Sequence, residues 1–540
     1  MKKILIFSFK YVLIAVVTFL GLSAKWYLNN YSGTKIEEMI FTLRAPLDGM
    51  ETGIMDSFQN YVLWPTAFIL IGFLLIIELF PKIKLSRKSK ESKTLALKVE
   101  IPLVILLLLF SFNHSLAMYH DLNIKGYLEN QANSSTLYEE HYADPNSVEL
   151  SFPENKPNLI HIFLESMETT YTTKEIGGAY DYNLIPNLTE IARNNVSFSA
   201  NEQLTGGYIT KSTHFTIGAL LAHTAGIPLS ISIHGNSYSG YGTFLPGAVS
   251  IGDVLNEEGY NQVLSIGSDA KFGGRKDYFT YHGEYEIYDY NHALDTGLIP
   301  EDYKVWWGFE DEKLYSFAKD QILELAESDR PFNFTMLTAD THHPDGYKCD
   351  LYEKIYPEQY SNVIHCADQQ VQEFIDWIKE QDFYDNTVIV INGDHNSMDP
   401  NYFTDLSEDY RRAPYNSIIN AHTEYRDANL KNRTFYTMDW YPTILAAMGV
   451  EIEGDRLALG TNMFSERPTL MEELGRAYVK DQLRWDMGTG PLSLSPCPFL
   501  YLSTPCLLHF LSTPYLSHFL STPCLSHFSI SRLPLLIVLS

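Results

Sequence analysis

The stretch that decides the fold is Asn386-Thr387-Val388-Ile389-Val390-Ile391-Asn392-Gly393-Asp394-His395-Asn396. Its run of Val and Ile indicates a strand that is buried on both faces, as in the parallel sheet of an α/β domain. Gly393 is expected to let the backbone turn, so that Asp394 and His395 lie together at the carboxyl end of the strand, where open α/β sheets place their ligand sites. A carboxylate beside an imidazole suits a divalent cation, although the pair alone is more often ordinary loop polarity.

Three other apolar runs end in polar residues in the same way. Residues 158–164 lead into Glu165-Ser166, residues 262–266 into Gly267-Ser268-Asp269, and residues 332–337 into Asp340-Thr341-His342-His343. The carboxyl ends of parallel strands meet at one edge of a sheet. We therefore predict a single site at this edge, assembled from the residues that follow four strands.

Helical stretches between these runs predict right-handed parallel crossovers. They are residues 184–192, with Pro186 in the first turn, residues 219–222 after Thr216, and residues 371–380. A further helix over residues 434–449 is expected to pack in the core. The predicted fold class is α/β with a mostly parallel sheet.

The first part of the chain carries three apolar stretches, residues 4–22, 61–80 and 101–118. Each is near the roughly 20 residues that a helix needs to cross a bilayer. The loop between the second and third stretches is rich in Lys and Arg and the first loop is mostly acidic, so the positive-inside rule puts the basic loop in the cytoplasm. Three crossings then place everything after Tyr119 outside the cell membrane.

Composition sets the predicted domain boundaries: a three-span membrane anchor over residues 1–120, a polar linker over 121–157, an α/β domain over 158–480 and a tail over 490–540. The tail repeats Leu-Ser-Thr-Pro-Cys-Leu-Leu-His-Phe with a nine-residue period and almost no charge, and it matches no solenoid pattern. We interpret it as repetitive DNA translated in an unintended frame. A membrane-surface tail is the alternative.

Charge and cysteine content limit the function further. The formal net charge of −27 argues against a nucleic-acid surface, which needs clustered Lys and Arg. Cys349 and Cys366 fall in the α/β domain, and two neighbouring thiols outside the cell are expected to form a disulfide. Such a bond would brace the loop after His342-His343. Two unpaired buried thiols are the alternative.

A nucleophile is expected in the hydroxyl-rich segment 205–217. Thr216 opens an apolar helical run, so its hydroxyl and the free amides beside it would face an incoming phosphate at a helix N-terminus. A metal on the same oxygen would lower its pKa. A simple N-cap threonine is the structural alternative, and Thr210, Ser212 and Thr213 leave the choice of hydroxyl open.

Five motifs then occur in the order seen in one family. They are Phe163-Leu164-Glu165-Ser166-Met167-Glu168, Phe215-Thr216-Ile217, Gly267-Ser268-Asp269-Ala270-Lys271-Phe272-Gly273-Gly274-Arg275, Thr341-His342-His343-Pro344-Asp345-Gly346 and Gly393-Asp394-His395. The chain resembles the membrane-anchored phosphoglycerol transferases, of the phosphoglycerol transferase I and lipoteichoic acid synthase type, within the alkaline phosphatase and sulfatase superfamily. The resemblance extends to about Gly475 and implies a three-layer sandwich preceded by transmembrane helices.

The resemblance also implies residue roles. Glu165, Thr216, Asp394 and His395 would hold one divalent cation, with manganese or magnesium favoured and zinc a further candidate, and Thr216 would be the nucleophile. Substrate contacts would come from Arg275, His342, His343 and Asp269. The guanidinium fork of Arg275 suits a phosphate independently of the family, whereas loop-bracing hydrogen bonds are the alternative for His343 and Asp269.

The implied reaction moves a glycerophosphate group from phosphatidylglycerol, through a phosphothreonine, to a periplasmic glucan or polyglycerolphosphate acceptor. The implied location is the bacterial inner membrane, with the catalytic domain in the periplasm. The alternatives are a phosphoethanolamine transferase, a phospholipid phosphodiesterase and an inactive, membrane-tethered glycan-binding protein. A sulfatase would need Cys or Ser followed by x-Pro-x-Arg, and the α/β domain has no such segment.

Overall fold

The computed structural model describes residues 2–34, 36, 39–40, 52–79, 89–229, 244–399, 401–407 and 409–485. Within them a six-stranded sheet has the order β4-β3-β5-β2-β6-β7. In that order the strands span Glu286–Tyr288, Asn261–Ile266, Phe332–Leu337, Asn158–Leu164, Thr387–Gly393 and Asn416–Ile419. Neighbouring strands are parallel except β7, which is antiparallel to β6. The predicted mostly parallel α/β sheet is confirmed.

The strands predicted from the four apolar runs are β3, β5, β2 and β6, and they are adjacent in this order. Every residue of β2 and β6 is buried, as expected for parallel strands that are covered on both faces. Because these four strands run in the same direction, the loops that follow them share one edge of the sheet.

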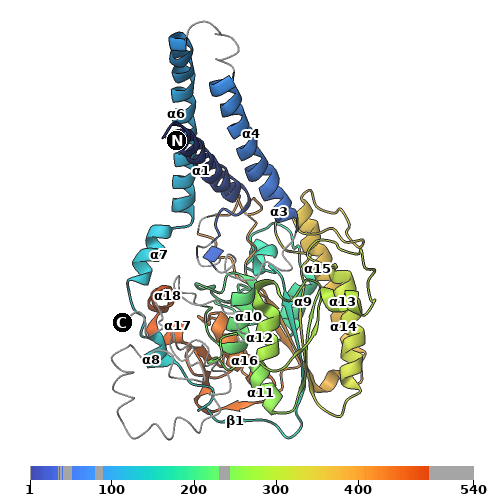
Figure 1. The fold of residues 1–540 in the computed structure, drawn as a ribbon. Coiled ribbons are helices and arrows are strands. Elements are labelled where there is room, and N and C mark those ends of the chain that lie inside the picture. The colour runs from blue at the N-terminus through green and yellow to red at the C-terminus, as the bar shows by residue number, and fades with distance from the viewer. Residues whose placement is uncertain are drawn as a thin grey trace, which may run out of the picture. The chain divides into compact units, whose positions relative to one another are not determined.

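Helices cover both faces of this sheet (Figure 1), so that the domain is a three-layer sandwich. One face carries α9 (Pro186–Asn194), α14 (Asp311–Ala326) and α15 (Gln359–Lys379), and the other carries α10 (Thr216–Ala225), α11 (Ile251–Glu257), α12 (Arg275–Tyr281) and α16 (Trp440–Ala447). The remaining elements are α13 (Tyr290–Asp295), α17 (Leu470–Leu474), α18 (Arg476–Arg484), β9 (Arg456–Leu457) and β10 (Gly460–Thr461).

Alternate residues of β2 build the two cores. Ile160 and Ile162 belong to the apolar cluster that includes side chains of α9, α14 and α15. His161 and Phe163 point to the opposite face, where their rings lie 6.3 and 5.3 Å from the ring of His223 in α10. This period of two is the geometry of an extended strand. It ties α10, the helix that begins at Thr216, directly to the central strand.

Gly393 is required for a reason that differs from the predicted turn. It is the last residue of β6, and its N–H donates to the carbonyl of Tyr415 at 2.8 Å. A Cβ atom at this position would overlap the carbonyl oxygen of Met167. Glycine therefore serves close packing of the β2–α9 loop against β6, and the chain leaves the sheet one residue later than we predicted.

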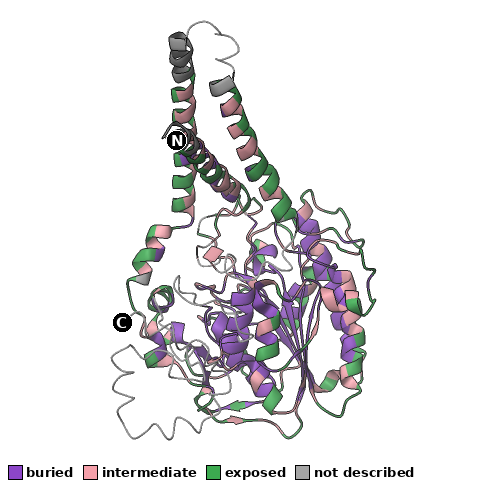
Figure 2. Cartoon of the chain, viewed as in Figure 1, coloured by how far each residue is buried: buried purple, intermediate pink, exposed green. Residues whose placement is uncertain are grey.

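The first part of the chain contains three helices that are long and apolar enough to cross a membrane, within the described residues. The helices are α1 (Lys2–Asn30), the run of α3 (Thr52–Phe58) and α4 (Trp64–Phe73) with the π-helical turns that flank α4, and α6 (Ser89–Asp121). Figure 2 shows them as largely exposed or intermediate, in contrast to the buried sheet. Residues 80–88 of the predicted basic loop and the repeat tail from residue 490 lie outside the described residues.

The segment 121–157, which the sequence suggested to be a linker, has regular structure. It contains α7 (Ile124–Gln131), α8 (Leu137–His141) and β1 (Leu150–Ser151), and β1 pairs with β8 (Glu451–Ile452). These short elements escaped prediction because none is long enough to show a hydrophobic period.

We expect acid to destabilise the domain through His161 and His223. Burial lowers the pKa of His161 to about 3 and that of His223 to about 4. Below the ordinary value of about 6.5 the unfolded chain binds protons at these two sites and the folded protein does not, until the pH reaches these lowered values. As the pH is lowered through this window, the free energy of unfolding should therefore decrease, by up to about 1.4 kcal/mol per pH unit for each histidine.

Urea denaturation between about pH 7 and about pH 4.5 measures this slope. The His223→Gln variant removes one of the two titrating groups and should flatten the slope. An unchanged slope in the variant would contradict the assignment.

Candidate functional site

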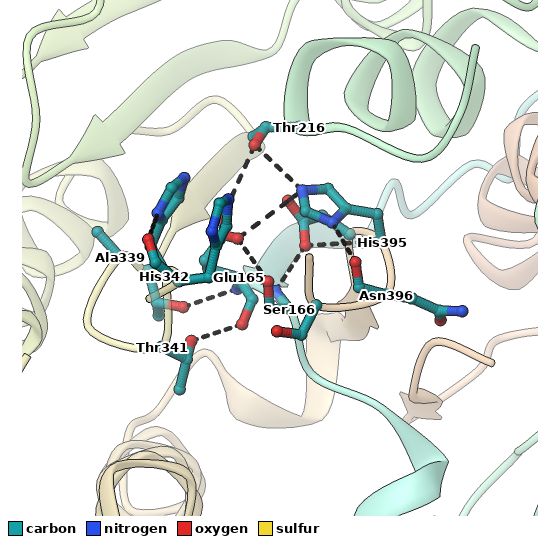
Figure 3. A network of polar contacts seen from close by, with 12 residues as sticks. Glu165, Ser166, Thr216, Ala339, Thr341, His342, His395 and Asn396 are labelled. Atoms are coloured by element: carbon teal, nitrogen blue, oxygen red, sulfur yellow. Dashed lines mark hydrogen bonds and ion pairs between the residues drawn. The ribbon is translucent and has the colours of Figure 1, made fainter. Parts of the chain in front are cut away.

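Glu165, Asp394 and His395 form a buried cluster at the carboxyl edge of the sheet (Figure 3), and one ligand atom of each lies within 4.8 Å of the others. Glu165 follows β2, and Asp394 and His395 follow β6. The side chains of Asp394 and His395 have no exposed surface, and that of Glu165 is 3% exposed. Such a group of buried donors is consistent with a metal site.

Backbone amides fix the carboxylate of Asp394. Its Oδ1 accepts hydrogen bonds from the N–H of Ser166 at 2.8 Å and from its own neighbour His395 at 2.7 Å. Its Oδ2 is buried, has no hydrogen bond to the residues that the structure describes, and lies 3.4 Å from Nε2 of His395. Because a buried carboxylate oxygen without a partner is costly, Oδ2 is where the site calls for a cation.

The orientation of His395 follows from its other nitrogen. Nδ1 lies 2.9 Å from the carbonyl oxygen of Asn396, so Nδ1 must carry the proton and donate it. In the neutral ring Nε2 is then an acceptor, and it faces Glu165 Oε1 at 3.7 Å. A histidine that is held in this way by a backbone carbonyl presents a lone pair to the cluster, as metal-binding histidines do.

Thr216 joins this cluster from the other side. Its Oγ1 is 3.4 Å from Glu165 Oε2 and 3.4 Å from His395 Nε2. It is the first residue of α10, and the N-cap position belongs to Phe215, so Thr216 is not the simple N-cap that was the structural alternative.

The other candidate hydroxyls lie elsewhere. Thr213 Oγ1 donates to the carbonyl of Thr210 at 3.1 Å, and Ser212 adopts a left-handed backbone with φ of 66° and is buried. No hydrogen bond joins these three side chains to the acidic cluster within the part of the chain that the structure describes.

The charges of the cluster depend on each other. Burial and the nearby charge of Glu165 raise the pKa of Asp394 to about 7. Burial also opposes ionisation of Glu165, but His395, His342 and the hydroxyl of Ser166 outweigh it and lower the pKa of this carboxyl. Two carboxylates this close repel each other when both are ionised. A divalent cation would remove that repulsion and let both be charged.

The residues present fit a divalent cation. Four donor atoms at about 2.1 Å from one tetrahedral ion lie about 3.4 Å from one another. Here Nε2 of His395 lies 3.4 Å from Thr216 Oγ1, 3.4 Å from Asp394 Oδ2 and 3.7 Å from Glu165 Oε1, and Thr216 Oγ1 lies 3.4 Å from Glu165 Oε2. The set is mostly oxygen with one nitrogen, which suits Mn²⁺, Mg²⁺ or Zn²⁺.

His342 lies at the rim of the cluster and His343 behind it. The ring of His342 is partly exposed, stacks on His343 with centroids 4.7 Å apart and contacts Trp307 at 4.8 Å. Burial lowers the pKa of both histidines, and a hydrogen bond of 2.7 Å holds Nδ1 of His342 to the carbonyl of His343. Nε2 of the neutral His342 ring is therefore an acceptor. His343 Nδ1 is buried and has no hydrogen bond among the described residues.

Arg275 and Asp269 are used within their own loop. Arg275 donates from Nε to the carbonyl of Phe272 at 2.9 Å and from Nη2 to that of Asp269 at 2.8 Å. The carboxylate of Asp269 accepts a hydrogen bond from the N–H of Lys271 at 2.8 Å. This is the loop-bracing hydrogen bond that the sequence suggested as the alternative to a substrate contact. Arg275 is 7% exposed, and burial lowers its pKa to about 10, against the opposing charges of Asp269 and Glu165.

Several residues support Glu165 and Asp394 in roles that the sequence did not predict. Ser166, with a left-handed φ of 54°, bonds Glu165 through its hydroxyl at 2.7 Å and Asp394 through its amide. Thr338 accepts the N–H of Glu165 at 3.0 Å, and Thr341 donates to the carbonyl of Glu165. A positive φ at serine is rare, and only the geometry reveals it.

Glu168 and Arg412 form a second layer behind these residues. The Glu168 carboxylate has no exposed surface. It accepts hydrogen bonds from both Nε and Nη2 of Arg412, and the bond from Nε is 2.9 Å long. The same pair holds Ser397, whose N–H donates to Glu168 at 2.8 Å and whose carbonyl accepts from Arg412 at 2.7 Å. The pair therefore fastens the turn after His395 to the loop after β2.

Comparison with known proteins agrees with this geometry. The chain matches the family described as Sulfatase over residues 157–450. It is 29% identical over 354 residues to Phosphoglycerol transferase I of Escherichia coli O6:K15:H31 and to that of Shigella flexneri, an alignment that covers 64% of this chain and 43% of either relative. The chain thus covers less than half the length of these relatives.

Solved structures give a weaker likeness. The lipoteichoic acid synthase LtaP from Listeria monocytogenes has a TM-score of 0.45 at 21% identity, covering 61% of this chain and 80% of that one. The lipooligosaccharide phosphoethanolamine transferase A from Neisseria meningitidis has a TM-score of 0.47 at 13% identity, covering 82% and 84%.

The mostly parallel sheet and the donor cluster at its carboxyl edge define an α/β domain of the alkaline phosphatase and sulfatase superfamily. The family match spans more than half of the 540 residues, and the chain belongs to the sulfatase family.

We expect a divalent cation to stabilise the folded protein through this cluster. A ligand that binds only the folded state adds about 2.7 kcal/mol at 100 times its Kd, so Mn²⁺ added after EDTA treatment should raise Tm by several degrees. Asp394→Asn should lose most of this response, whereas Asp382→Asn, which alters an exposed acid before the start of β6, at the opposite end of that strand from Asp394, should keep it. Equal responses in all three proteins, measured by scanning fluorimetry, would rule the site out.

Breaking the Glu168–Arg412 pair should be costly because it leaves a charge largely buried without a partner. We expect Glu168→Gln to lower the free energy of unfolding by about 3 kcal/mol. The matched control is Glu466→Gln, which breaks the exposed 2.7 Å pair with Arg426 and should cost less than about 1 kcal/mol. Urea denaturation compares the two variants, and similar small costs would contradict the role given to Glu168.

Proposed function

We propose that this protein is a metal-dependent phosphoglycerol transferase, which moves glycerophosphate from phosphatidylglycerol to a glycan or polyglycerolphosphate acceptor through a phosphothreonine at Thr216. The observation that carries the proposal is the position of Thr216 Oγ1, 3.4 Å from both Glu165 and His395 in a buried donor cluster. A hydroxyl that only capped a helix would have no need of these neighbours.

Glu165, Thr216, Asp394 and His395 would hold the divalent cation, with Mn²⁺ or Mg²⁺ favoured and Zn²⁺ a further candidate. The bound cation would lower the pKa of the Thr216 hydroxyl and balance negative charge on the transferring phosphate. Thr216 is also the first residue of α10, so free backbone amides and the positive end of the helix dipole lie next to its oxygen. These groups favour a phosphate at this point.

The surrounding residues would bind and orient the substrate. His342 Nε2 is an acceptor at the rim, so it can receive a hydrogen bond from a hydroxyl of the glycerol or of the acceptor. Arg275 would supply positive charge toward the phosphate from its buried position. His343 and Asp269 would act indirectly, by holding His342 and Arg275 in place.

The membrane supplies the reason for a lipid donor. Three apolar helices precede the domain, and the relatives with 29% identity are named for phosphoglycerol transfer. We propose a bacterial inner-membrane protein with a three-span anchor over residues 1–120 and a periplasmic catalytic domain over residues 158–480. The alternative of phosphoethanolamine transfer differs from this proposal in the donor lipid. The alternative of phospholipid hydrolysis differs in the acceptor, which would be water.

The test uses the purified full chain in detergent with a fluorescent phosphatidylglycerol. Wild-type protein should release diacylglycerol, and Thr216→Ala should reduce the rate by at least about 10³-fold, because loss of a nucleophile removes the covalent step. The matched control is Ser212→Ala, which deletes a nearby hydroxyl outside the cluster and should retain activity.

Each outcome decides between the candidate functions. Equal release by Thr216→Ala and wild type would discard Thr216 as nucleophile. Release of diacylglycerol and free glycerophosphate, with no glycerophosphate transferred to added glucan, would indicate a phosphodiesterase. Turnover only of phosphatidylethanolamine, offered in a parallel assay, would indicate the phosphoethanolamine transferase. No turnover of either lipid would favour the glycan-binding protein.

A further inference from the structure

Cys349 and Cys366 lie side by side although they are 17 positions apart, with their Sγ atoms at 3.4 Å. Both are thiols in the structure, and they are 7% and 5% exposed. Cys349 lies within the loop that joins β5 to α15, and Cys366 lies in α15. A disulfide has an S–S distance of about 2.05 Å, so the two sulfur atoms need to approach by only about 1.4 Å.

The surroundings of Cys366 favour thiol chemistry. The two thiols share a hydrogen bond in which either sulfur can be the donor, and Nε2 of Gln370 donates to the sulfur of Cys366 at 3.5 Å. When Cys349 is the donor, these two hydrogen bonds lower the pKa of Cys366, against the effect of burial. The thiolate is the form of cysteine that attacks a disulfide, so Cys366 is the attacking residue of the pair.

The same loop is fastened to α15 at its other end. The hydroxyl of Tyr360, near the start of α15, donates to the carbonyl of Thr341 at 2.8 Å. His342 and His343 therefore lie in a short segment between two attachment points on one helix. Tyr360 provides the first attachment by a hydrogen bond. At the second attachment Cys349 contacts α15 through the thiol of Cys366 and, at 4.0 Å, through Nε2 of Gln370. Between the two attachments Nε2 of Gln359 donates to the carbonyls of Asp345 and Gly346 at 3.3 and 3.0 Å.

We propose that Cys349 and Cys366 form a disulfide that clamps the loop carrying His342 and His343 onto α15. The oxidant would be a disulfide-exchanging dithiol protein or a small-molecule disulfide. The Cys366 thiolate attacks one sulfur of that disulfide and expels the other as a thiolate. Cys349 then loses its proton to solvent and attacks Cys366 in the mixed disulfide, which expels the second thiolate. Two thiols are oxidised to one disulfide, and the oxidant takes up two electrons.

Peptide mapping of the full chain tests the bond without any assay of activity. Trypsin cuts after Lys348, Lys354 and Lys379, so the unreduced protein should yield peptides 349–354 and 355–379 joined together, and reduction should separate them. Replacing the tail residues Cys497, Cys506 and Cys524 by serine removes competing thiols. If both peptides are fully alkylated before reduction, in protein isolated from an oxidising compartment, the proposal is overturned.

Hydrogen exchange tests the clamp itself. Reduction of the wild type should speed amide exchange in the segment 342–348 at least several-fold, and the Cys349→Ser/Cys366→Ser variant should exchange at the fast rate under both conditions. Strand β6 (387–393) is the internal control and should not change. A linked pair of peptides with unchanged exchange in 342–348 would overturn the clamping role, while the proposed transferase activity would be unaffected by that result.

Discussion

The site depends on the register of three parallel strands. β2 lies between β5 and β6, with Phe163 opposite Leu337 and Leu164 opposite Gly393. This register sets Glu165 beside Asp394, although 229 positions separate them in the chain. A shift of β2 by one residue would turn every side chain of the strand to the other face. The buried alternation of Ile160 and Ile162 with His161 and Phe163 holds the register, so the apolar core is what aligns the polar cluster.

The cluster is held together against its own electrostatics. Two buried carboxylates are unfavourable unless hydrogen bonds or opposite charge compensate them. Backbone amides of Ser166 and His395 compensate one oxygen of Asp394, and the hydroxyl of Ser166 compensates Glu165. The remaining oxygen of Asp394 has no hydrogen bond within the described part of the chain. The fold therefore compensates most of the buried carboxylate charge and leaves one oxygen that a cation would compensate. The left-handed backbone of Ser166 is a source of conformational strain in this arrangement.

Much of the fold could be predicted because its signals are local. The Val and Ile run of 388–391 and the similar runs before Glu165, Gly267 and Asp340 indicated four strands and their direction, and Pro186 marked the start of α9. The predicted role of Gly393 as a turn residue was wrong. Glycine is needed there because Met167 approaches closely, and Met167 lies in a loop more than two hundred positions earlier in the chain. The same limit hid Thr338 and Arg412 and the supporting roles of Ser166 and Glu168, because each of these contacts joins residues that are distant in the sequence.

The choice of Thr216 among four hydroxyls shows what tertiary structure adds. The sequence places Thr210, Ser212, Thr213 and Thr216 within one turn-rich segment and offers no reason to prefer one by composition. In the structure α10 is anchored by His223, whose ring contacts Phe163 of β2 and stacks on Trp440 of α16 with centroids 6.2 Å apart. The helix is rigid over these residues, so its first residue has a fixed position above the sheet edge. Thr216 alone of the four lies on this rigid element, and a reacting oxygen must be placed to within a fraction of an ångström of its partners. The buried ring of His223 therefore helps to fix the start of α10, and with it the hydroxyl of Thr216, relative to the edge of the sheet.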